Sequence, residues 1–430
     1  MNNHIPKIRF TQFSDEWEET TIEQIGDLLK GNGLSKGLLV ENGKYKCLLY
    51  GEIFTRYDYA VKDCYSRTNQ LIGTKSQVGD VLMPGSTTTS GIDLAKAVAV
   101  FEDDILLGGD IIIIRQKNNQ YDPYFLATLL SDIDREKIGE IAQGITIMHL
   151  HASQLKNRSL SLPSLSEQEK IGELFQTLDN LIDEEQKRLD KLRNIKAALL
   201  HKMFPSDTTD NNLNGGGNSL IMSYLQKYNL VCTSSASNIP SIRFQGYTQP
   251  WQKKQLGDFG VVSMCKRVMK YQTKPKGEIP FYKIGTFGST PDAYISLDLF
   301  SELKRKYAYP KKGDILLSAA GTIGRTVRYL GKDEYFQDSN IVWLQHNGKL
   351  NNDFLFVLYS TIKWNSLEGS TLKRLYNGNL LATSVFIPSL QEQQQIGNFF
   401  RVQDAQIERT EQYITTLHSI RTALLQKMFA

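Results

Sequence analysis

The pattern of apolar and polar positions along this chain predicts two long amphipathic helices. Apolar residues recur at alternating three- and four-residue spacing between Ile171 and Leu199, and again between Ile396 and Leu424. This heptad spacing places apolar side chains along one face of a helix. Each helix of ~40 residues is about 60 Å long at 1.5 Å per residue. A helix of this length must bury its apolar face, and we expect the two helices to pack antiparallel against each other.

The two predicted helices belong to an internal repeat. Residues 163–204 align with residues 388–429 without a gap, and 18 of the 42 positions are identical. Both segments open with the sequence PSLxEQ, in which Ser and Glu have the spacing of a capping box at a helix start. Both segments end with KMF. An internal repeat of this strength sets the architecture of the chain.

The repeat extends into the segments that precede the helices. The sequence IPxIRF occurs at residues 5–10 and at residues 239–244, and a tryptophan follows in each half. The offset between equivalent residues falls from 234 there to 225 at Gly144 and Gly369, and it is constant through the helices. Insertions therefore occur in the globular segments and not in the helices, where one added residue rotates the apolar face by about 100°. Two halves related by a pseudo-twofold axis are predicted.

Each globular segment is predicted to be an α+β domain, because short apolar runs alternate with turn-rich stretches. The predicted strands are Lys46–Leu49, Asp80–Met83, Ala97–Phe101, Ile111–Arg115, Ile279–Ile284, Asp314–Leu317 and Asn340–Leu344. Helices are predicted at equivalent places, near residues 123–133 and 353–361. The predicted organisation is a globular domain over residues 1–162, a long helix over 163–204, a linker over 205–238, a second globular domain over 239–386 and a second long helix over 387–430.

Charge is distributed unevenly between the two halves. The whole chain has a net charge of +4. Residues 5–162 hold 17 Lys and Arg against 21 Asp and Glu, whereas residues 239–386 hold 21 against 11 and so have a net charge of +10. A strongly basic domain attracts polyanions, of which nucleic acid is the commonest. The first half shows no such excess, so a DNA-binding role there requires a local patch.

Composition indicates a soluble, cytoplasmic protein. No apolar run reaches the ~18–20 residues of a membrane span, and the polar N-terminal sequence lacks the apolar core of a signal peptide. The four cysteines are scattered without the spacing of a metal site, and we expect reduced thiols.

A search for catalytic motifs finds one short pattern. No Walker A sequence is present, and His149 and His151 lack a nearby pair of carboxylates for a metal site. Asp292, Glu302 and Lys304 have the spacing of a metal-dependent nuclease signature, in which the acidic groups hold Mg²⁺ and the lysine polarises a water. Lys304 belongs to a basic triplet and the first half has no equivalent set, so a nuclease remains only an alternative.

Taken together, these features resemble the specificity (S) subunit of type I restriction–modification enzymes, the HsdS family. The resemblance is carried by IPxIRF near the start of each half, by GD[VI]L at residues 79–82 and 313–316, and by PSLxEQxxIG before a helix that ends in KMF. It covers nearly the whole chain apart from the linker. It implies two target-recognition domains separated by two long antiparallel helices, which form a coiled-coil rod.

The resemblance also implies a function and a set of partners. Each recognition domain would bind one half of a split double-stranded DNA target, and the helices would set the spacer and dock two methyltransferase (M) subunits. Restriction (R) subunits would join through the complex. Family members carry no catalytic centre, so no enzymatic activity, metal or cofactor is expected in this chain. S-adenosylmethionine, ATP and Mg²⁺ would be used by the partner subunits.

Candidate DNA contacts were chosen from loop position and residue type. Base edges are recognised by Arg, Lys, Asn, Gln and hydroxyl side chains, and phosphates by basic ones. In the first domain the predicted residues are Arg56, Tyr57, Arg67, Ser86, Thr87 and Thr88, and in the second they are Lys283, Thr286, Lys304, Arg305, Lys306, Ser318 and Arg325.

The helices offer candidate contacts with partner subunits. The predicted residues are Leu178, Ile182, Leu189, Ile407, Tyr413 and Ile414, for each of which packing within the chain is the alternative. Two other functions remain open at this point. A self-contained nuclease requires the Asp292 set and Mg²⁺, and a coiled-coil scaffold shows no salt-dependent affinity for DNA.

Overall fold

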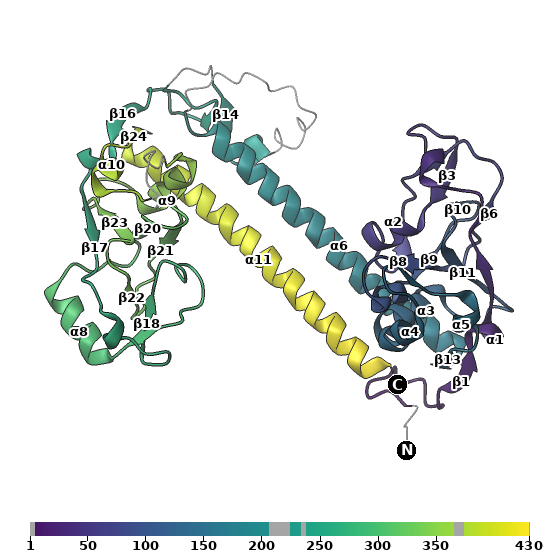
Figure 1. The fold of residues 1–430 in the computed structure, drawn as a ribbon. Helices are drawn as coiled ribbons and strands as arrows, with labels where there is room; N and C mark the ends of the chain where they lie inside the picture. Colours follow the sequence, from purple (N-terminus) through teal and green to yellow (C-terminus); the bar gives the residue numbers. More distant parts are fainter. Residues whose placement is uncertain (1–4, 206–223, 234–237, 365–373, 430) are drawn as a thin grey trace. The chain divides into compact units, whose positions relative to one another are not determined.

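The structure is a computed structural model that describes residues 5–205, 224–233, 238–364 and 374–429. The chain divides into two compact units, one of residues 1–187 with 412–430 and one of residues 188–411. Each unit therefore combines one globular domain with parts of both long helices, α6 (Leu165–Lys202) and α11 (Leu390–Met428) (Figure 1). Both predicted long helices are confirmed, with 38 and 39 residues.

The first unit contains a five-stranded sheet, a four-stranded sheet, two further strand pairs and several short helices. Its strands are β1 (Glu18–Thr21), β2 (Gly26–Lys30), β3 (Tyr45–Leu48), β4 (Ala60–Val61), β5 (Arg67–Thr68), β6 (Thr74–Lys75), β7 (Val81–Pro84), β8 (Ser86–Thr87), β9 (Val98–Val100), β10 (Leu106–Leu107), β11 (Ile111–Gln116), β12 (Met148–His149) and β13 (Ser159–Leu162). Its short helices are α1 (Ile22–Ile25), η1 (Lys36–Leu38), α2 (Tyr50–Thr55), η2 (Gly91–Ala95), α3 (Pro123–Thr128), η3 (Leu129–Ile133), α4 (Arg135–Ile141) and α5 (Ala152–Lys156). The sheet orders are β2-β11-β7-β9-β4 and β5-β3-β10-β6, and β1 pairs with β13 and β8 with β12.

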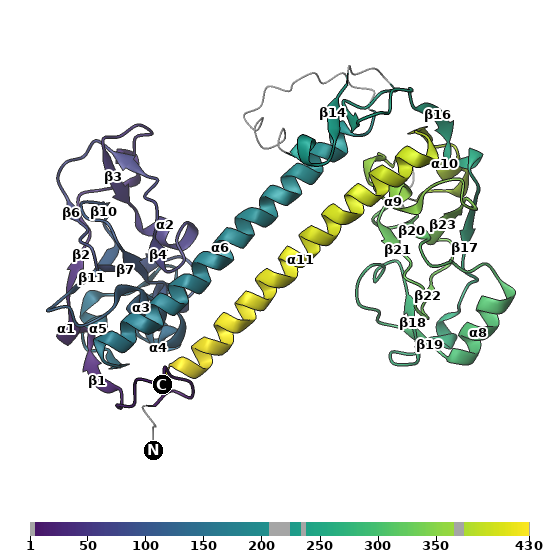
Figure 2. The ribbon, with the colours of Figure 1, turned by 180° about the vertical axis from the view of Figure 1, so that it is seen from behind.

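The second unit repeats this plan with fewer strands. Its strands are β14 (Leu230–Cys232), β15 (Ile242–Phe244), β16 (Gln252–Gln255), β17 (Val261–Met264), β18 (Ile279–Tyr282), β19 (Tyr294–Ile295), β20 (Ile315–Ser318), β21 (Thr326–Arg328), β22 (Tyr335–Phe336), β23 (Ile341–Gln345) and β24 (Ser384–Ile387). Its short helices are η4 (Leu256–Asp258), η5 (Lys270–Gln272), α8 (Leu297–Lys306), α9 (Asn352–Thr361) and α10 (Asn377–Leu381). The sheet orders are β17-β23-β20-β21 and β19-β18-β22, with β16 paired to β24 and β14 to β15. Helix α8 lies beside β18 and β19, at the end of the unit away from α9 (Figures 1 and 2).

The predicted α+β fold and all seven predicted strands are confirmed. The apolar run at Ile111 becomes strand β11, which lies between β2 and β7 and whose first four residues are buried. In the second unit the equivalent strand β23 lies between β17 and β20. The strand pair β1–β13 and its counterpart β16–β24 were not predicted, because all four strands are short and one strand of each pair, β1 or β16, is wholly polar.

The KMF sequence that ends each long helix fills an aromatic cluster in the core of a globular domain. Phe429, at the end of α11, lies in the core of the first unit, with ring centroids 6.1 Å from Trp17, 5.3 Å from Phe125 and 5.8 Å from Phe175. Both Phe429 and Trp17 are buried. The helix that follows the second domain in sequence therefore ends inside the first.

The same arrangement recurs in the second unit. Phe204, at the end of α6, lies 5.7 Å from Trp251, 5.8 Å from Phe354 and 6.4 Å from Phe400. The rings of Phe204 and Phe354 are stacked with an interplanar angle of 24°. The equivalent rings of the first unit, Phe429 and Phe125, are stacked with an angle of 19°. We call these two groups of rings the aromatic sockets. The repeated KMF is thus explained by a repeated packing site.

Within each unit the two long helices run antiparallel, as predicted. In the first unit Phe175 contacts Phe429, and four residues later Asp179 pairs with Arg421, eight residues earlier in the partner helix. In the second unit Arg193 pairs with Glu411 at 2.6 Å, and Lys196 pairs with Asp404. In both units, residues further along α6 therefore contact residues earlier in α11, as in an antiparallel pair.

The cysteines are free thiols, and the linker is described only in part. Cys47, Cys64 and Cys265 are buried and Cys232 is exposed. Burial raises the pKa of Cys64 to about 11 and that of Cys47 and Cys265 to about 12. Residues 206–223 and 234–237 of the predicted linker lie outside the described residues. In the ranges that the structure does describe, no helix is long and apolar enough to cross a membrane.

Candidate nucleic-acid interface

The repeated Arg and Glu of the sequence motifs meet in a salt bridge in each unit, part-buried in the first unit and buried in the second. Arg9 of IPxIRF donates to Glu167 of PSLxEQ through Nε at 2.6 Å and Nη2 at 2.7 Å. Arg243 donates to Glu392 in the same way, at 2.7 and 2.8 Å. A two-point Arg–carboxylate contact fixes orientation as well as distance. Each pair therefore fastens the start of a half to the start of its long helix.

The Gln and Gly of the same motif position the helix that follows β11 in the first unit and β23 in the second. Gln168 accepts a hydrogen bond from the backbone N–H of Asp122 at 3.2 Å, and Asp122 caps α3. Gly172 lies so close to this cap that a Cβ atom would come within 2.2 Å of Asp122 Oδ1. Gln393 and Gly397 make the equivalent contacts with the Asn351 cap of α9. The PSLxEQxxIG motif is thus structural, because the side of the long helix that carries its Glu, Gln and Gly contacts the globular domain in each unit.

In the first domain the predicted DNA-contact residues divide into exposed and buried ones. Arg56 is exposed, 3.6 Å from Glu52 and with its guanidinium 5.5 Å from the centroid of the Tyr65 ring. Tyr57 is buried, its hydroxyl donates to the Asp63 carbonyl at 3.0 Å, and burial raises the pKa of its phenol. Arg67 is half-buried on β5. Burial of Tyr57 argues against a base contact by its ring.

The predicted hydroxyls after β7 are mostly engaged within the protein. Ser86 is buried and donates to Asp110 at 2.5 Å. Thr87 is also buried, with its hydroxyl 2.8 Å from that of Thr89. Thr88 is exposed. Sequence shows that these residues are polar and lie in a turn-rich stretch, but not which hydroxyls the fold uses for itself.

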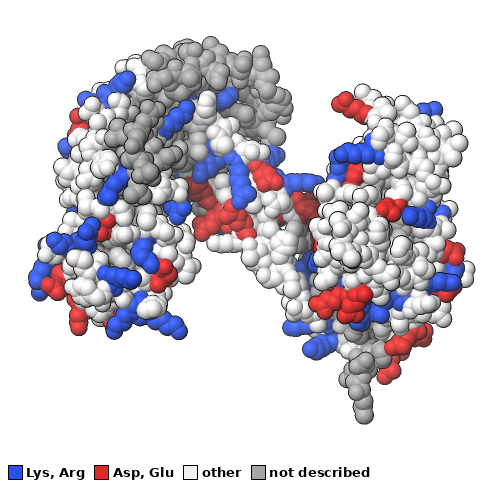
Figure 3. Space-filling view, in the orientation of Figure 1, with Lys and Arg blue, Asp and Glu red and all other residues white. Residues whose placement is uncertain are grey.

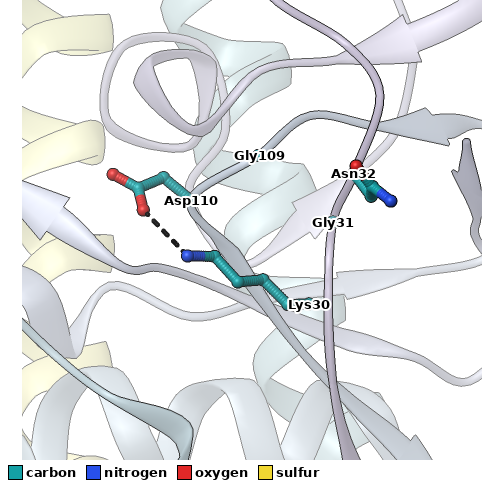
Figure 4. A pocket seen from close by; sticks show the side chains of 5 residues that line it. All are labelled: Lys30, Gly31, Asn32, Gly109 and Asp110. Carbon is teal, nitrogen blue, oxygen red and sulfur yellow. Dashed lines mark ion pairs between the residues drawn. The ribbon is translucent and has the colours of Figure 1, made fainter.

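An open hollow adjoins Ser86 on this domain. It is lined by Lys30, Gly31, Asn32, Gly109 and Asp110, and Figure 4 shows Lys30 reaching toward Asp110, with 3.5 Å between their charged atoms. The Asp110 carboxylate therefore offsets the charge of Lys30 and also accepts the hydrogen bond from the Ser86 hydroxyl. We assign no ligand to this hollow.

In the second domain the structure brings two predicted loops together. Arg325 is exposed, and its Nη1 donates to the carbonyl of Phe287 at 2.9 Å, next to the Lys283–Thr286 turn. Ser318 is buried and accepts from the backbone N–H of Arg325 at 2.8 Å. Lys283 pairs with Asp292 at 2.8 Å. Arg325 thus links both loops, whereas Ser318 maintains loop shape.

The predicted loop at Lys304, Arg305 and Lys306 is wrong, because these residues form the last turn of α8. Ser296 caps the start of this helix, and basic residues near a helix C-terminus complement its dipole. All three side chains are exposed, with Lys304 paired to Asp333 at 3.0 Å. Lys and Arg gather around α8, with acidic residues interspersed (Figure 3). Here the basic charge remains on the surface, where it is accessible to a polyanion.

The nuclease pattern is not assembled into one site. Asp292 pairs with Lys283, and Glu302 pairs with Lys306 at 2.8 Å, a contact that lowers the pKa of Glu302. Lys304 pairs with a third carboxylate. Across the described part of the chain, no three His, Cys, Asp or Glu residues are grouped so that they could hold a metal ion.

Three of the six predicted partner contacts are buried inside the protein: Ile182, Leu189 and Ile414. These residues occupy the apolar face of the long helices, so their packing within the chain accounts for them. Leu178 and Ile407 are half-buried, and Tyr413 is 45% exposed. Among the six, only Tyr413 presents a large apolar surface.

Sequence reasoning missed two elements beside the predicted loops. In the first domain β12 pairs with β8, so that His149 lies opposite Ser86. In the second, Arg374 forms an isolated bridge with Ala320, in the loop after β20, and donates to the Ser339 carbonyl at 2.9 Å. The internal repeat could have indicated that these two residues have equivalent places, because His149 and Arg374 align at the offset of 225.

Comparison with known proteins identifies the family. Residues 14–194 and 248–418 match the family model described as type I restriction modification DNA specificity domain. A putative type I restriction enzyme specificity subunit of Haemophilus influenzae is 58% identical over 143 residues, which cover 33% of this chain and 37% of that protein. The MjaVIII specificity subunit of Methanocaldococcus jannaschii is 24% identical over 219 residues, 48% of this chain and 50% of that protein. The matches span about a third to a half of these relatives.

A solved structure shares the fold. The S subunit of a type I restriction–modification system from M. genitalium superposes with a TM-score of 0.60 at 16% identity, over 99% of both chains. The family model covers both globular domains and most of both long helices. The chain therefore belongs to the family of type I restriction modification DNA specificity proteins.

Proposed function

We propose that this chain is the DNA-binding specificity subunit of a type I restriction–modification complex, and that each globular domain recognises one half of a bipartite double-stranded target. The observation that carries the proposal is the duplicated specificity domain, matched at residues 14–194 and 248–418. The +10 charge of residues 239–386 supports it, because phosphate neutralisation supplies much of the affinity for DNA. The exposed Arg56 and Arg325 are the strongest candidates for base or phosphate contact.

The proposal assigns the long helices two tasks. They set the separation of the half-sites, and they dock two methyltransferase subunits, with restriction subunits joining through the complex. The absence of insertions from the helical repeat supports the first task, since DNA rises about 3.4 Å per base pair and any change in helix length changes the half-site distance. Exposed Tyr413 supports the second, as an aromatic anchor for a partner.

The chain acts in this proposal without chemistry of its own. Methyl transfer with S-adenosylmethionine belongs to the methyltransferase subunits, and ATP- and Mg²⁺-dependent cleavage belongs to the restriction subunits. The complex acts in the cytoplasm, where its DNA lies.

The decisive test is the methylome of a host that expresses this chain with its methyltransferase subunit. We expect one split motif with a fixed spacer, and its loss when this chain alone is deleted. A methylome that keeps the motif after deletion contradicts the proposal. Purified chain with Mg²⁺ and DNA is the control for the nuclease alternative, and we expect no cleavage.

A length change in the helices tests their role in setting the spacer. Four residues inserted after Lys187 in α6 and after the equivalent Gln412 in α11 add about 6 Å, so the spacer should grow by one or two base pairs. Both half-sites should stay unchanged. The control replaces four residues at the same places without changing length. A methylome with the original spacer after insertion rules out this role for the helices.

A further inference from the structure

A short hairpin in the first unit presents an isoleucine to solvent. Gln143 and His149 exchange both backbone hydrogen bonds, at 2.9 and 2.7 Å. Gly144 has φ of +144°, and a Cβ atom there would lie 1.9 Å from the carbonyl oxygen of Ile147. Only glycine fits this position, so the turn has a defined shape. Ile145 follows it and is fully exposed, at 102%.

The base of this hairpin is anchored in the fold. Strand β12 pairs with β8, with Met148 opposite Thr87, and Leu150 is buried and donates to the carbonyl of Gly85 at 2.9 Å. Thr88 continues the chain from β8 and is exposed. The hairpin and the predicted recognition loop therefore form one surface. Ile145 itself contributes nothing to the core, and it is the most exposed large apolar residue in the described part of the chain.

The internal repeat shows which hairpin positions vary. Gly144, Thr146 and Leu150 are each identical in the second half at the offset of 225, whereas positions 145 and 147–149 differ, with Ile145 replaced by a serine. The corresponding residues 369–373 lie outside the described residues, so this comparison concerns sequence alone. The glycine that sets the turn is retained and the residue next to it differs, as expected of a position that distinguishes two half-sites.

The chemistry of isoleucine restricts what it can recognise on DNA. The major-groove edges of the base pairs carry one methyl group, the 5-methyl of thymine, and the minor groove carries none. We propose that Ile145 is a specificity-determining residue that contacts a thymine methyl in the half-site bound by the first domain. This inference rests on the proposed function. The exposed hydroxyl of Thr88, on the same surface, can contact the polar edges nearby.

The experiment replaces each thymine of that half-site by deoxyuridine, which lacks only the methyl. Binding is measured for the assembled complex with methyltransferase subunits, carrying either the natural chain or Ile145→Ala. At one thymine, loss of the methyl should weaken binding by the natural chain about fourfold. The same replacement should change binding by Ile145→Ala less than about 1.5-fold, because the variant no longer contacts that methyl. Ile145→Ala should keep its melting temperature.

A control variant shows whether the effect is specific to Ile145, and two different outcomes would contradict the inference and the proposed function separately. Val78→Ala removes another apolar side chain, 59% exposed, in the turn before β7, where the Val78 backbone N–H donates to Asp103, and this variant should still show the deoxyuridine effect in full. If no thymine shows a smaller effect in Ile145→Ala than in the natural chain, Ile145 does not recognise a methyl group. If the natural complex fails to prefer its split sequence over a scrambled one, the proposed function itself fails.

Discussion

Phe429→Ala should destabilise the first unit by about 3–5 kcal/mol, although this residue follows the second domain in sequence. The ring is buried between Trp17, Phe125 and Phe175, and its removal leaves a cavity in their socket. Phe204→Ala should have the same effect on the second unit. Hydrogen–deuterium exchange resolved by peptide is the measurement. In Phe429→Ala, exchange should accelerate in β7 and β11, and in Phe204→Ala it should accelerate in β20 and β23.

The critical part of this result is that each substitution loosens the unit whose globular domain does not directly precede it in sequence. If Phe429→Ala loosens only the second unit, then the end of α11 does not pack where the structure places it. Tyr376→Ala is the matched control, because this residue is 56% exposed and its truncation should change stability by less than about 0.5 kcal/mol. Phe429→Leu should cost less than alanine, since leucine fills part of the socket.

The sockets show how far sequence reasoning reaches in this protein. The repeat and its heptad spacing were sufficient to predict α6 and α11, because a 3.6-residue period is a local property of the sequence. The identical KMF endings indicated that these residues matter. They could not indicate which core each fills, since two copies of one sequence fit either socket equally well. That choice depends on the antiparallel pairing of the helices, which is a tertiary property.

The candidate site was less predictable for a different reason. A serine or tyrosine in a turn-rich stretch either forms hydrogen bonds within the protein or contacts a ligand. The sequence pattern is the same in the two cases. Ser86 and Ser318 are buried and hold their own loops, whereas Arg56 and Arg325 remain exposed. The basic triplet at Lys304 was expected in a loop. It completes helix α8 instead, whose start is capped by Ser296.

Arg243→Ala should destabilise the second unit by about 3–5 kcal/mol, because it leaves the carboxylate of Glu392 buried without its partner. The two side chains are 3% and 1% exposed, so water cannot replace the lost hydrogen bonds without opening the fold. Arg243→Lys should recover only part of this loss, since an ammonium group lacks the planar fork that contacts both oxygens. The free energy of opening, from exchange at β20 and β23, is the measurement.

The double variant decides whether an orphaned charge is the cause. Arg243→Ala combined with Glu392→Gln removes the buried charge together with its partner, and it should be more stable than Arg243→Ala alone. If the double variant is less stable by the sum of the single effects, the two residues act independently and the pair does not fasten IPxIRF to the helix start. Arg9 and Glu167 offer the matched cycle in the first unit, with Arg9 at 11% exposure. A smaller penalty is expected there, because water reaches that pair more easily and screens the charge that is left.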